Sequence, residues 1–580
     1  MFSPLIYLLL IQVSGLIHIL MIPISRPSKI RRVALETSLL AFLASLVIWL
    51  LYFDQGNPGY QFVVDYTYFK IGVDGISIYF VLLTTIIFPI AILSSWYSID
   101  KDVKTFFSIL LLLEFLLLCV FLCTDILLFY VFFESILPPL FFMIGKWGSL
   151  NKIKASFYLF LYTLFGSLFM LLAFLTLYII SGTTDIQILS TIAIPFDLQL
   201  ILFIAIFFSF AIKTPLLPVH LWLPLAHAEA PLAGSIILAG IVLKLALYGI
   251  LRILLPILPE ASLFFTPLVY TICVITIIYS CLTTLRQIDF KVVIAYSSIG
   301  HMAICILGLF SNTLQGIEGS VILGIAHGLV SPALFFLLGG VIYDRTHSRL
   351  ISYYRGLVIY MPVLAIGFFI STLANIAIPL SGNFIGEMLS LLGSFERSPI
   401  LTIFASTSIV LSASYSIWLY NRMMTGSYSP YLPVLQDMNK REFYILFPLL
   451  LMTFIIGMNP NLIFSSLHVS FFPLTCSLQV SKLSLSLLSP ISSEFSPPCF
   501  IASNPSLSHP SLREGKKGNK GRKEGNGVLS ILPYSPPFPS PALWQGSYLV
   551  LIDSINECLL VLFIYLFFFF LYKLYIYIRR

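Results

Sequence analysis

Seven ionisable side chains of this sequence fall inside long apolar stretches, where a charge is costly. They are Glu114, Glu134, Lys213, Lys244, His301, His327 and Glu387. A charged side chain at the centre of a membrane-spanning helix costs about 2.5–3.5 kcal/mol on insertion scales, so such residues usually face a bundle interior and line a pathway. Acids, amines and imidazoles in this setting predict proton transfer between side chains, with no catalytic residue for bond chemistry.

Lys213 stands directly before Thr214-Pro215 and Pro218, at the end of an apolar stretch. Proline interrupts a helix, and unwound backbone at membrane depth can hydrate a charge. A lysine whose proton affinity depends on its distance from a carboxylate such as Glu134 would load and release a proton as that distance changes. Two alternatives remain: a lysine that extends from a helix end to the membrane surface, and a glutamate that is simply protonated and hydrogen-bonded.

Four further residues extend this set. Lys244 lies in the middle of an apolar stretch, far from any loop. His301 and His327 titrate near neutral pH and are expected to hand protons along a water file. A lone buried histidine is more often structural, but two histidines with two lysines at membrane depth favour a relay. Glu387 follows an interruption at residues 379–382 and so resembles Lys213 in its place beside a broken helix.

A secondary group of candidates is Glu114, His220, His227 and Glu229. The histidine spacing, with Glu229 two residues further on, raises the possibility of a metal site. The HExxH arrangement is missing, and Pro224 disrupts any helix that would hold the ligands. The sequence therefore predicts a hydrated gate or a re-entrant turn here and no metal site, and it predicts a weaker charge-pairing role for Glu114.

The composition requires these residues to sit in a membrane protein. The chain has 580 residues, of which 59% are hydrophobic and 10% charged, whereas soluble domains average about 25% charged. The net charge of +7 is spread through short loops, so it does not indicate nucleic-acid binding. The absence of a CxxC pair and of a glycine-rich dinucleotide motif predicts that the chain itself binds no cofactor. Residues 1–22 are typical of a span rather than of a cleaved signal peptide.

The expected fold is all-α, a polytopic transmembrane bundle of about 14 helices before residue 470. The seventh and twelfth spans should be discontinuous, because prolines interrupt them. Two broken helices favour two inverted five-helix repeats, spans four to eight and nine to thirteen. The predicted span cores are 4–23, 34–53, 75–98, 105–123, 125–145, 155–180, 198–224, 231–254, 264–284, 291–310, 318–342, 358–395, 400–420 and 443–466.

Loop charges predict the orientation. Most loop lysines and arginines follow odd-numbered spans; Lys70, Arg252 and Arg397 are the exceptions. This bias places the N-terminus outside. The predicted domains are residues 1–104 (spans one to three), 105–254 (first half-channel repeat), 255–425 (second half-channel repeat), 426–470 (last core span) and 471–580 (an extension).

The extension differs from the rest in composition. Residues 480–545 are rich in Ser, Pro and Leu and contain a basic run, Arg513–Lys523, and an apolar segment follows at residues 548–578. Low-complexity sequence of this kind is typical of disorder. The basic run would lie on the outer side, against the charge rule, so we expect the extension to stand outside the working core. A read-through or fusion of neighbouring sequence is one explanation, and a lineage-specific tail is the other.

Several motifs together resemble the subunit 4 family of mitochondrial NADH:ubiquinone oxidoreductase (respiratory complex I), whose members are antiporter-like membrane-arm subunits. The resemblance covers about residues 1–466. The motifs are Gly72-Val-Asp-Gly-Ile-Ser77, Phe132-Phe-Glu-Ser135, Lys213-Thr-Pro-Leu-Leu-Pro-Val-His-Leu-Trp-Leu-Pro224, His227-Ala-Glu-Ala-Pro231, Leu238-Ala-Gly-Ile-Val-Leu-Lys244 and Ala295-Tyr-Ser-Ser-Ile-Gly-His-Met302.

This resemblance implies a proton channel in the membrane arm, driven by quinone reduction elsewhere in the complex. It implies that the chain is a core subunit of a proton-translocating reductase without a redox centre of its own. It further implies other membrane-arm subunits as partners, with NADH, FMN, iron–sulfur clusters and ubiquinone bound by other subunits. The implied location is the mitochondrial inner membrane, with the N-terminus on the intermembrane-space side.

The resemblance also assigns roles by position. These are a pairing glutamate (Glu134), a switchable lysine (Lys213), a central lysine (Lys244), relay histidines (His301 and His327) and a terminal acid (Glu387). Leu225 departs from the family pattern, which commonly has an acidic residue there. Three alternatives stay open: a stand-alone cation/proton antiporter subunit, a membrane scaffold needed for assembly, and a plastid relative of the same complex.

Overall fold

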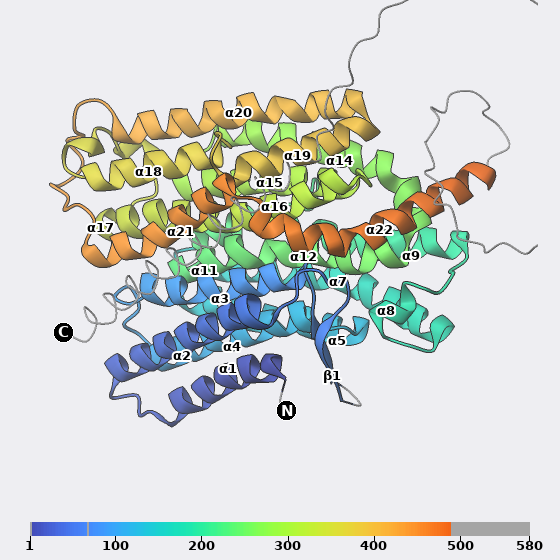
Figure 1. Cartoon of the computed structure of the whole chain (residues 1–580). Helices are drawn as coiled ribbons and strands as arrows, with labels where there is room; N and C mark the ends of the chain where they lie inside the picture. Colours follow the sequence, from blue (N-terminus) through green and yellow to red (C-terminus); the bar gives the residue numbers. More distant parts are fainter. Residues whose placement is uncertain (1–2, 67–68, 489–580) are drawn as a thin grey trace, which may run out of the picture. The chain divides into compact units, whose positions relative to one another are not determined.

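Apolar helices make up most of the part of the chain that the structure, a computed structural model, describes: residues 3–66 and 69–488 (Figure 1). By length and composition, 14 of the described helices could cross a membrane. The all-α expectation is confirmed, apart from one hairpin. In the N-terminal half the helices are α1 (Pro4–Met21), α2 (Pro27–Val47), α3 (Ser77–Ser94), α4 (Val103–Leu122), α5 (Ile126–Ser135), α6 (Leu137–Trp147), α7 (Lys152–Ser181), α8 (Ile186–Leu189), α9 (Phe196–Lys213), α10 (Trp222–Glu229), α11 (Leu232–Ile237), α12 (Leu243–Gly249) and α13 (Leu255–Ile257).

The second half continues the same pattern. Its helices are α14 (Pro259–Thr284), α15 (Phe290–Leu309), α16 (Leu314–Leu334), α17 (Tyr343–Thr346), α18 (Pro362–Asn375), α19 (Gly382–Arg397), α20 (Pro399–Met424), α21 (Lys440–Met458) and α22 (Asn461–Leu488). The spans that carry Lys244 and His327 are almost fully enclosed: the candidate spans from 232 to 257 and from 314 to 346 are 94% and 100% buried over their apolar windows.

Both predicted helix breaks are present. The seventh span ends at Lys213 and resumes as α10, and the twelfth is divided into α18 and α19. A third break was not expected: the fifth span changes from α5 to α6 at Ile136, directly before Pro138 and Pro139. The reason is the same in all three cases, because proline cannot donate the helical hydrogen bond.

Wide π-helical turns, which the sequence pattern does not reveal, distort three spans. They cover Ile48–Tyr52 at the end of the second span, Leu238–Val242 and Ile250–Leu254 in the eighth, and Phe335–Ile342 in the eleventh. A π turn inserts one extra residue per turn and often marks a functional site. In the eighth span the two π turns flank α12, the segment that holds Lys244.

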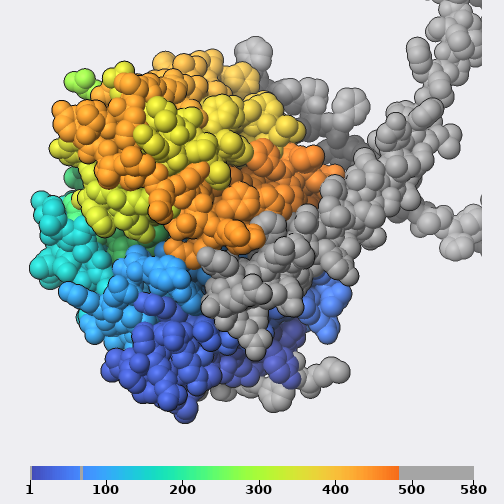
Figure 2. Space-filling view, turned by 90° about the vertical axis from the view of Figure 1, so that its left-hand side faces the viewer, coloured from blue at the N-terminus to red at the C-terminus, as the bar shows by residue number. Residues whose placement is uncertain are grey.

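The loops after odd-numbered spans meet at one end of the bundle, which we call the cation-rich end. The Trp147 indole donates to the carbonyl of Lys101 (2.9 Å), and Arg345 pairs with Glu442 (2.8 Å) across more than ninety residues of sequence. Figure 2 looks on to this end, with the N-terminal segment in blue at the bottom and residues of about 350–450 in yellow and orange at the top. The grouping agrees with the alternation predicted from loop charges.

The opposite, cation-poor end carries two elements that the sequence analysis did not foresee. One is an antiparallel hairpin of β1 (Gln61–Tyr66) and β2 (Phe69–Val73). The other is α22, which packs against the cation-poor ends of α3 and α16: Ser466 bonds to Tyr79 (2.6 Å), and His468 bonds to Glu318 (3.0 Å).

Two boundaries therefore need correction. The predicted span 443–466 is in fact two helices, α21 and α22, separated at Asn459–Pro460, where proline again interrupts the helix. The predicted boundary at residue 470 falls inside α22, whose Phe471 and Leu478 are fully buried. The basic run and the apolar segment of the predicted extension lie outside the described residues, and the inverted repeats stay a prediction.

Candidate proton-pathway site

Four of the predicted residues form one file of neighbouring side chains through the bundle. Lys244 Nζ lies 3.0 Å from His327 Nδ1. The rings of His327 and His301 have centroids 5.4 Å apart. His301 Nδ1 lies 2.7 Å from Glu387 Oε1. Side chains from four helices that are far apart in sequence thus join an amine to a carboxylate through two imidazoles.

Close helix packing makes these contacts possible. Lys244 is on α12, His301 on α15, His327 on α16 and Glu387 on α19. Helices α16 and α19 approach backbone to backbone at Gly386. A Cβ atom added there would lie only 2.6 Å from the Cα of Leu323, so a glycine is needed at this contact. All four ionisable side chains are at most 4% exposed as residues, so the file is shielded from lipid and from bulk water.

Lys244 is held without a carboxylate. Its ammonium donates to the carbonyl of Ala239 (2.5 Å), which belongs to the π turn one turn earlier on the same span. In a π turn, carbonyl oxygens are displaced from the regular i to i+4 pattern, so one of them can accept from a side chain. The central lysine is therefore solvated by its own helix and by one imidazole.

A small polar chamber surrounds the far end of the file. The space beside His301 and Glu387 measures about 10 Å³, close to the minimum that one water needs. Hydroxyl-bearing residues line it: Ser297, Ser408, Ser412 and Tyr415. Glu387 thus lies among groups that can donate or accept hydrogen bonds, as a proton-exchanging acid requires.

Lys213 and Glu134 lie near one another but do not touch. The Lys213 ammonium donates to the carbonyl of Phe133 (3.0 Å), the residue before Glu134, and lies 3.1 Å from the centroid of the Phe133 ring. In the described chain these two charges form no ion pair within 4.0 Å, although they interact electrostatically. The pair is therefore in a separated arrangement, with Lys213 at the end of α9 beside the break that the sequence predicted.

The secondary candidates do not come together. Glu114 is fully buried and interacts with Gln12 of α1, away from the file. The His220 ring lies near Tyr279 and Tyr296 of α14 and α15, with centroids 5.6 and 6.1 Å away. In the described residues no three His, Cys, Asp or Glu side chains form a group that could hold a metal ion.

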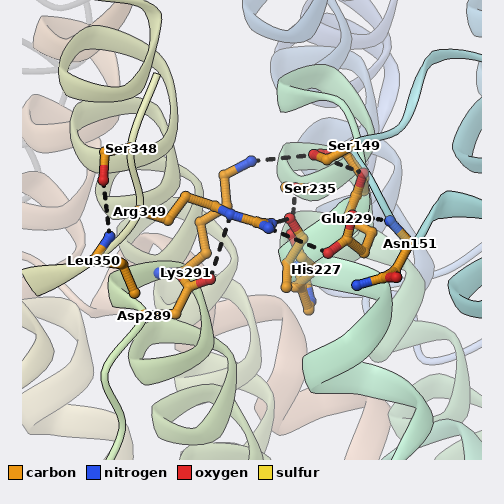
Figure 3. A network of polar contacts seen from close by, with 12 residues as sticks. Ser149, Asn151, His227, Glu229, Ser235, Asp289, Lys291, Ser348, Arg349 and Leu350 are labelled. Atoms are coloured by element: carbon orange, nitrogen blue, oxygen red, sulfur yellow. Dashed lines mark hydrogen bonds and ion pairs between the residues drawn. The ribbon is translucent and has the colours of Figure 1, made fainter. Parts of the chain in front are cut away.

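His227 and Glu229 belong instead to a polar network at the cation-rich end (Figure 3). Glu229 accepts from the backbone N–H of Asn151 (3.0 Å) and pairs with Arg349 (3.2 Å). Arg349 also pairs with Asp289 (3.4 Å), and burial raises the pKa of the Asp289 carboxyl while Arg349 opposes that shift. The network ties the short loops after four odd-numbered spans to one another.

Lys291, which sequence reasoning placed among ordinary loop cations, is buried inside this network. It is 2% exposed, and its ammonium lies 5.1 Å from the Tyr343 ring centroid and 3.5 Å from the carbonyl of Ala230. His227, stacked on Phe335, interacts electrostatically with both Lys291 and Lys244. The one available signal was the position of Lys291 two residues after Asp289, at the very start of an apolar span.

Arg252, another predicted loop cation, is largely enclosed as well. Its guanidinium forms an ion pair with Asp74, and the two side chains are 13% and 4% exposed. The ring of Tyr60 lies 4.8 Å from the guanidinium carbon. Nothing in the spacing of residues 74 and 252 predicts that they meet, because long-range packing alone joins them.

Comparisons with known proteins agree with this architecture. The family NADH:quinone oxidoreductase/Mrp antiporter, TM, matches residues 123–412. NADH-ubiquinone oxidoreductase chain 4 of Mycosarcoma maydis is 57% identical over 449 residues, which cover 76% of this chain and 93% of that protein. The chain 4 protein of Chondrus crispus is 47% identical over 479 residues, 81% of this chain and 97% of that protein.

Solved structures show the same fold. A chain of respiratory complex I from Thermus thermophilus with bound NADH superposes with a TM-score of 0.73 at 29% identity, covering 83% of this chain and 99% of that chain. A chain of the Mrp complex from Dietzia sp. gives a TM-score of 0.71 at 17% identity, over 82% of this chain and 98% of that chain, and this likeness concerns the fold alone. The resemblance found in the sequence motifs is confirmed: the chain belongs to the NADH:quinone oxidoreductase/Mrp antiporter family and, within it, to the NADH-ubiquinone oxidoreductase chain 4 proteins.

Proposed function

We propose that this chain translocates protons as a membrane-arm subunit of NADH:ubiquinone oxidoreductase, along the file from Lys244 through His327 and His301 to Glu387. Family membership supports the place in the complex. The observations that support the route are the contact of Lys244 with His327 (3.0 Å), the neighbouring rings of His327 and His301 (centroids 5.4 Å apart), and the contact of His301 with Glu387 (2.7 Å). Neutral imidazole has one donor and one acceptor nitrogen, so each histidine can receive a proton on one side and release one on the other.

Proton uptake in this proposal occurs from the cation-rich end, which the charge rule assigns to the matrix. Lys291 and His227 lie in the polar network at that end (Figure 3), and His227 interacts electrostatically with both Lys291 and Lys244. Their electrostatic contact with one another makes them the first stations of the uptake path. Leu225, where the family commonly has an acid, leaves this uptake dependent on Glu229.

Lys213 and Glu134 form the switch in this proposal. In their separated arrangement the lysine is held by a backbone carbonyl and an aromatic face rather than by a carboxylate. Closure of the pair would favour the charged form of Lys213, and opening would release its proton toward Lys244. Neighbouring membrane-arm subunits would drive the change through electrostatic coupling between adjacent ion pairs.

The electron-transfer chemistry lies elsewhere in this proposal. NADH, FMN, iron–sulfur clusters and ubiquinone would be bound by other subunits, and this chain would contribute no redox centre. The location would be the mitochondrial inner membrane, with the N-terminus on the intermembrane-space side.

The direct test replaces Lys244 by methionine, which keeps an unbranched side chain but removes the charge. The assembled complex is placed in proteoliposomes, and protons moved per NADH oxidised are measured. In Lys244→Met we expect either fewer protons moved per NADH or an equal fall in the rates of proton translocation and NADH oxidation. The control Lys154→Met, on the exposed face of α7, should behave as the parent. An unchanged proton ratio at full turnover in Lys244→Met would refute the route, and it would favour the scaffold alternative.

A further inference from the structure

A second polar line leaves Lys244 in a direction that the proposed route does not use. Lys244, Tyr248 and Arg252 are four residues apart along the eighth span, so they share one helix face. The Tyr248 hydroxyl donates to the carbonyl of Phe121 (3.1 Å) and accepts from Arg252 Nε (3.4 Å). At 1.5 Å per residue, the eight residues from Lys244 to Arg252 rise about 12 Å toward the cation-poor end.

This line ends at a cavity of about 290 Å³, partly open at the cation-poor end. Arg252 and Asp74 line its floor, and Tyr60 lies beside the guanidinium. One wall comes from α22, through Ser470 and Ser477 among others. The cavity is large enough for several waters, each of which occupies about 30 Å³ in the liquid.

A cavity with room for water this close to the central lysine would be a hazard for a proton-translocating chain. Protons at Lys244 could leave early, and protons from the cation-poor side could flow back into the file. The only charged groups that line the cavity among the described residues are the buried pair Arg252 and Asp74. An arginine side chain keeps its charge in proteins, so its guanidinium is a permanent cation across the passage.

We propose that Arg252, positioned by Asp74, is an electrostatic barrier that prevents protons from passing between the cavity at the cation-poor end and Lys244. A fixed arginine excludes protons and cations from a narrow passage by repulsion. Asp74 orients the guanidinium and compensates the cost of burying it. Tyr248 lies between Lys244 and Arg252 along the helix, and its hydroxyl is already committed to Phe121 and Arg252. The inference rests on the proposed function, because the barrier matters only if Lys244 carries protons.

The test measures passive leak, with no NADH present, so that pumping does not contribute. The assembled complex in proteoliposomes is subjected to a potassium diffusion potential, and internal pH is followed with a dye. We expect Arg252→Gln to raise the proton leak at least tenfold. Arg252→Lys keeps the cation and should remain sealed. Asp74→Asn leaves the arginine charge in place but no longer orients it, so its leak should be well below that of Arg252→Gln.

Two results would overturn the barrier. One is a sealed Arg252→Gln complex. The other is an equal leak in Arg252→Gln and Asp74→Asn, which a merely structural ion pair would produce. Adding Lys244→Met to Arg252→Gln should abolish the leak, and a leak that persists also counts against the proposal, because the protons then bypass Lys244.

Failure of the barrier and failure of the proposed function can be told apart. The Lys244→Met pumping assay tests the route alone, and the Arg252 series tests the seal alone. If Arg252→Gln does not assemble, Arg252→His replaces it. The introduced histidine, which Asp74, Tyr60 and Tyr248 face, changes its charge near neutral pH. The complex with Arg252→His should leak more protons than the Arg252→Lys complex at pH 8, and as few as that complex at pH 5.5. A leak of the same size at both pH values would overturn the proposal.

Discussion

Glu387 is the residue whose replacement tests the proposed route most sharply, because two substitutions separate its charge from its reach. Glu387→Gln keeps the shape and a hydrogen-bond acceptor for His301 but removes the negative charge and the site that takes up a proton. Glu387→Asp keeps the charge but shortens the side chain by one methylene, which withdraws the carboxylate from its 2.7 Å contact with His301.

The magnitude follows from the kind of bond that is lost. A hydrogen bond to a charged group contributes about 1.5–3 kcal/mol and a neutral one about 0.5–1.5 kcal/mol. Glu387→Gln should therefore weaken this contact by about 1–2 kcal/mol, which is roughly a 5- to 30-fold change in an equilibrium that depends on it. The contact is nearly fully buried, with side chains 3% and 6% exposed, so screening by solvent reduces the effect little.

The assay is coupled turnover in proteoliposomes, with NADH oxidation and proton uptake followed together. We expect Glu387→Gln to lower proton translocation at least about fivefold, as its smaller estimate requires, and Glu387→Asp to have an intermediate effect. Glu396→Gln is the matched control, since Glu396 is an exposed glutamate on the same helix. Full proton translocation in Glu387→Gln, with normal assembly, would show that the terminal acid of the file is not needed and that the route is wrong.

Three further outcomes follow from the structure. Gly386→Ala should destabilise the assembled complex by about 1–3 kcal/mol, because the new methyl group meets the backbone of Leu323. Thermal inactivation measures this effect. The control is Gly145→Ala, whose nearest contact would be an ordinary 3.5 Å. Glu229→Gln should lower stability by about 1–3 kcal/mol, because Arg349 loses one of its two carboxylate partners and keeps only Asp289, whereas Asp65→Asn, in an exposed pair, should cost less than about 1 kcal/mol; equal melting temperatures would count against the network. Glu114→Gln should leave proton translocation unchanged, since Glu114 faces α1 rather than the file, and a lost proton ratio would place it on the pathway.

Much of the fold follows from local sequence. Apolar length gives the spans, and the prolines near Lys213 and before Gly382 give two of the three breaks, because both effects act within a few residues. The break at Ile136 was missed although Pro138 and Pro139 mark it, since an apolar stretch on both sides hides a change of helix. Helix α22 was missed because its mean hydropathy over the best window is only 1.3, and residues rich in serine read as a tail.

The candidate site, like the fold, was predictable from the sequence only in part. Ionisable residues at membrane depth were found by type alone, and four of them meet in one file. Lys291 and Arg252 were missed because charge near a span end usually marks a loop, and only tertiary packing shows that these two side chains turn inward. Partner identity is also beyond local pattern: the pairing of Asp74 with Arg252 joins residues far apart in sequence.

The π turn at Leu238–Val242 has a consequence for how many protons the file holds at once. Because a neutral carbonyl rather than a carboxylate accepts from Lys244, the described part of the file has a single counter-charge, Glu387, at its far end. Two cations on adjacent stations, such as Lys244 and His327 at 3.0 Å, would repel strongly at low dielectric. If protons follow the proposed route, the file would hold about one proton at a time, and transport would advance by displacement of that proton rather than by storage.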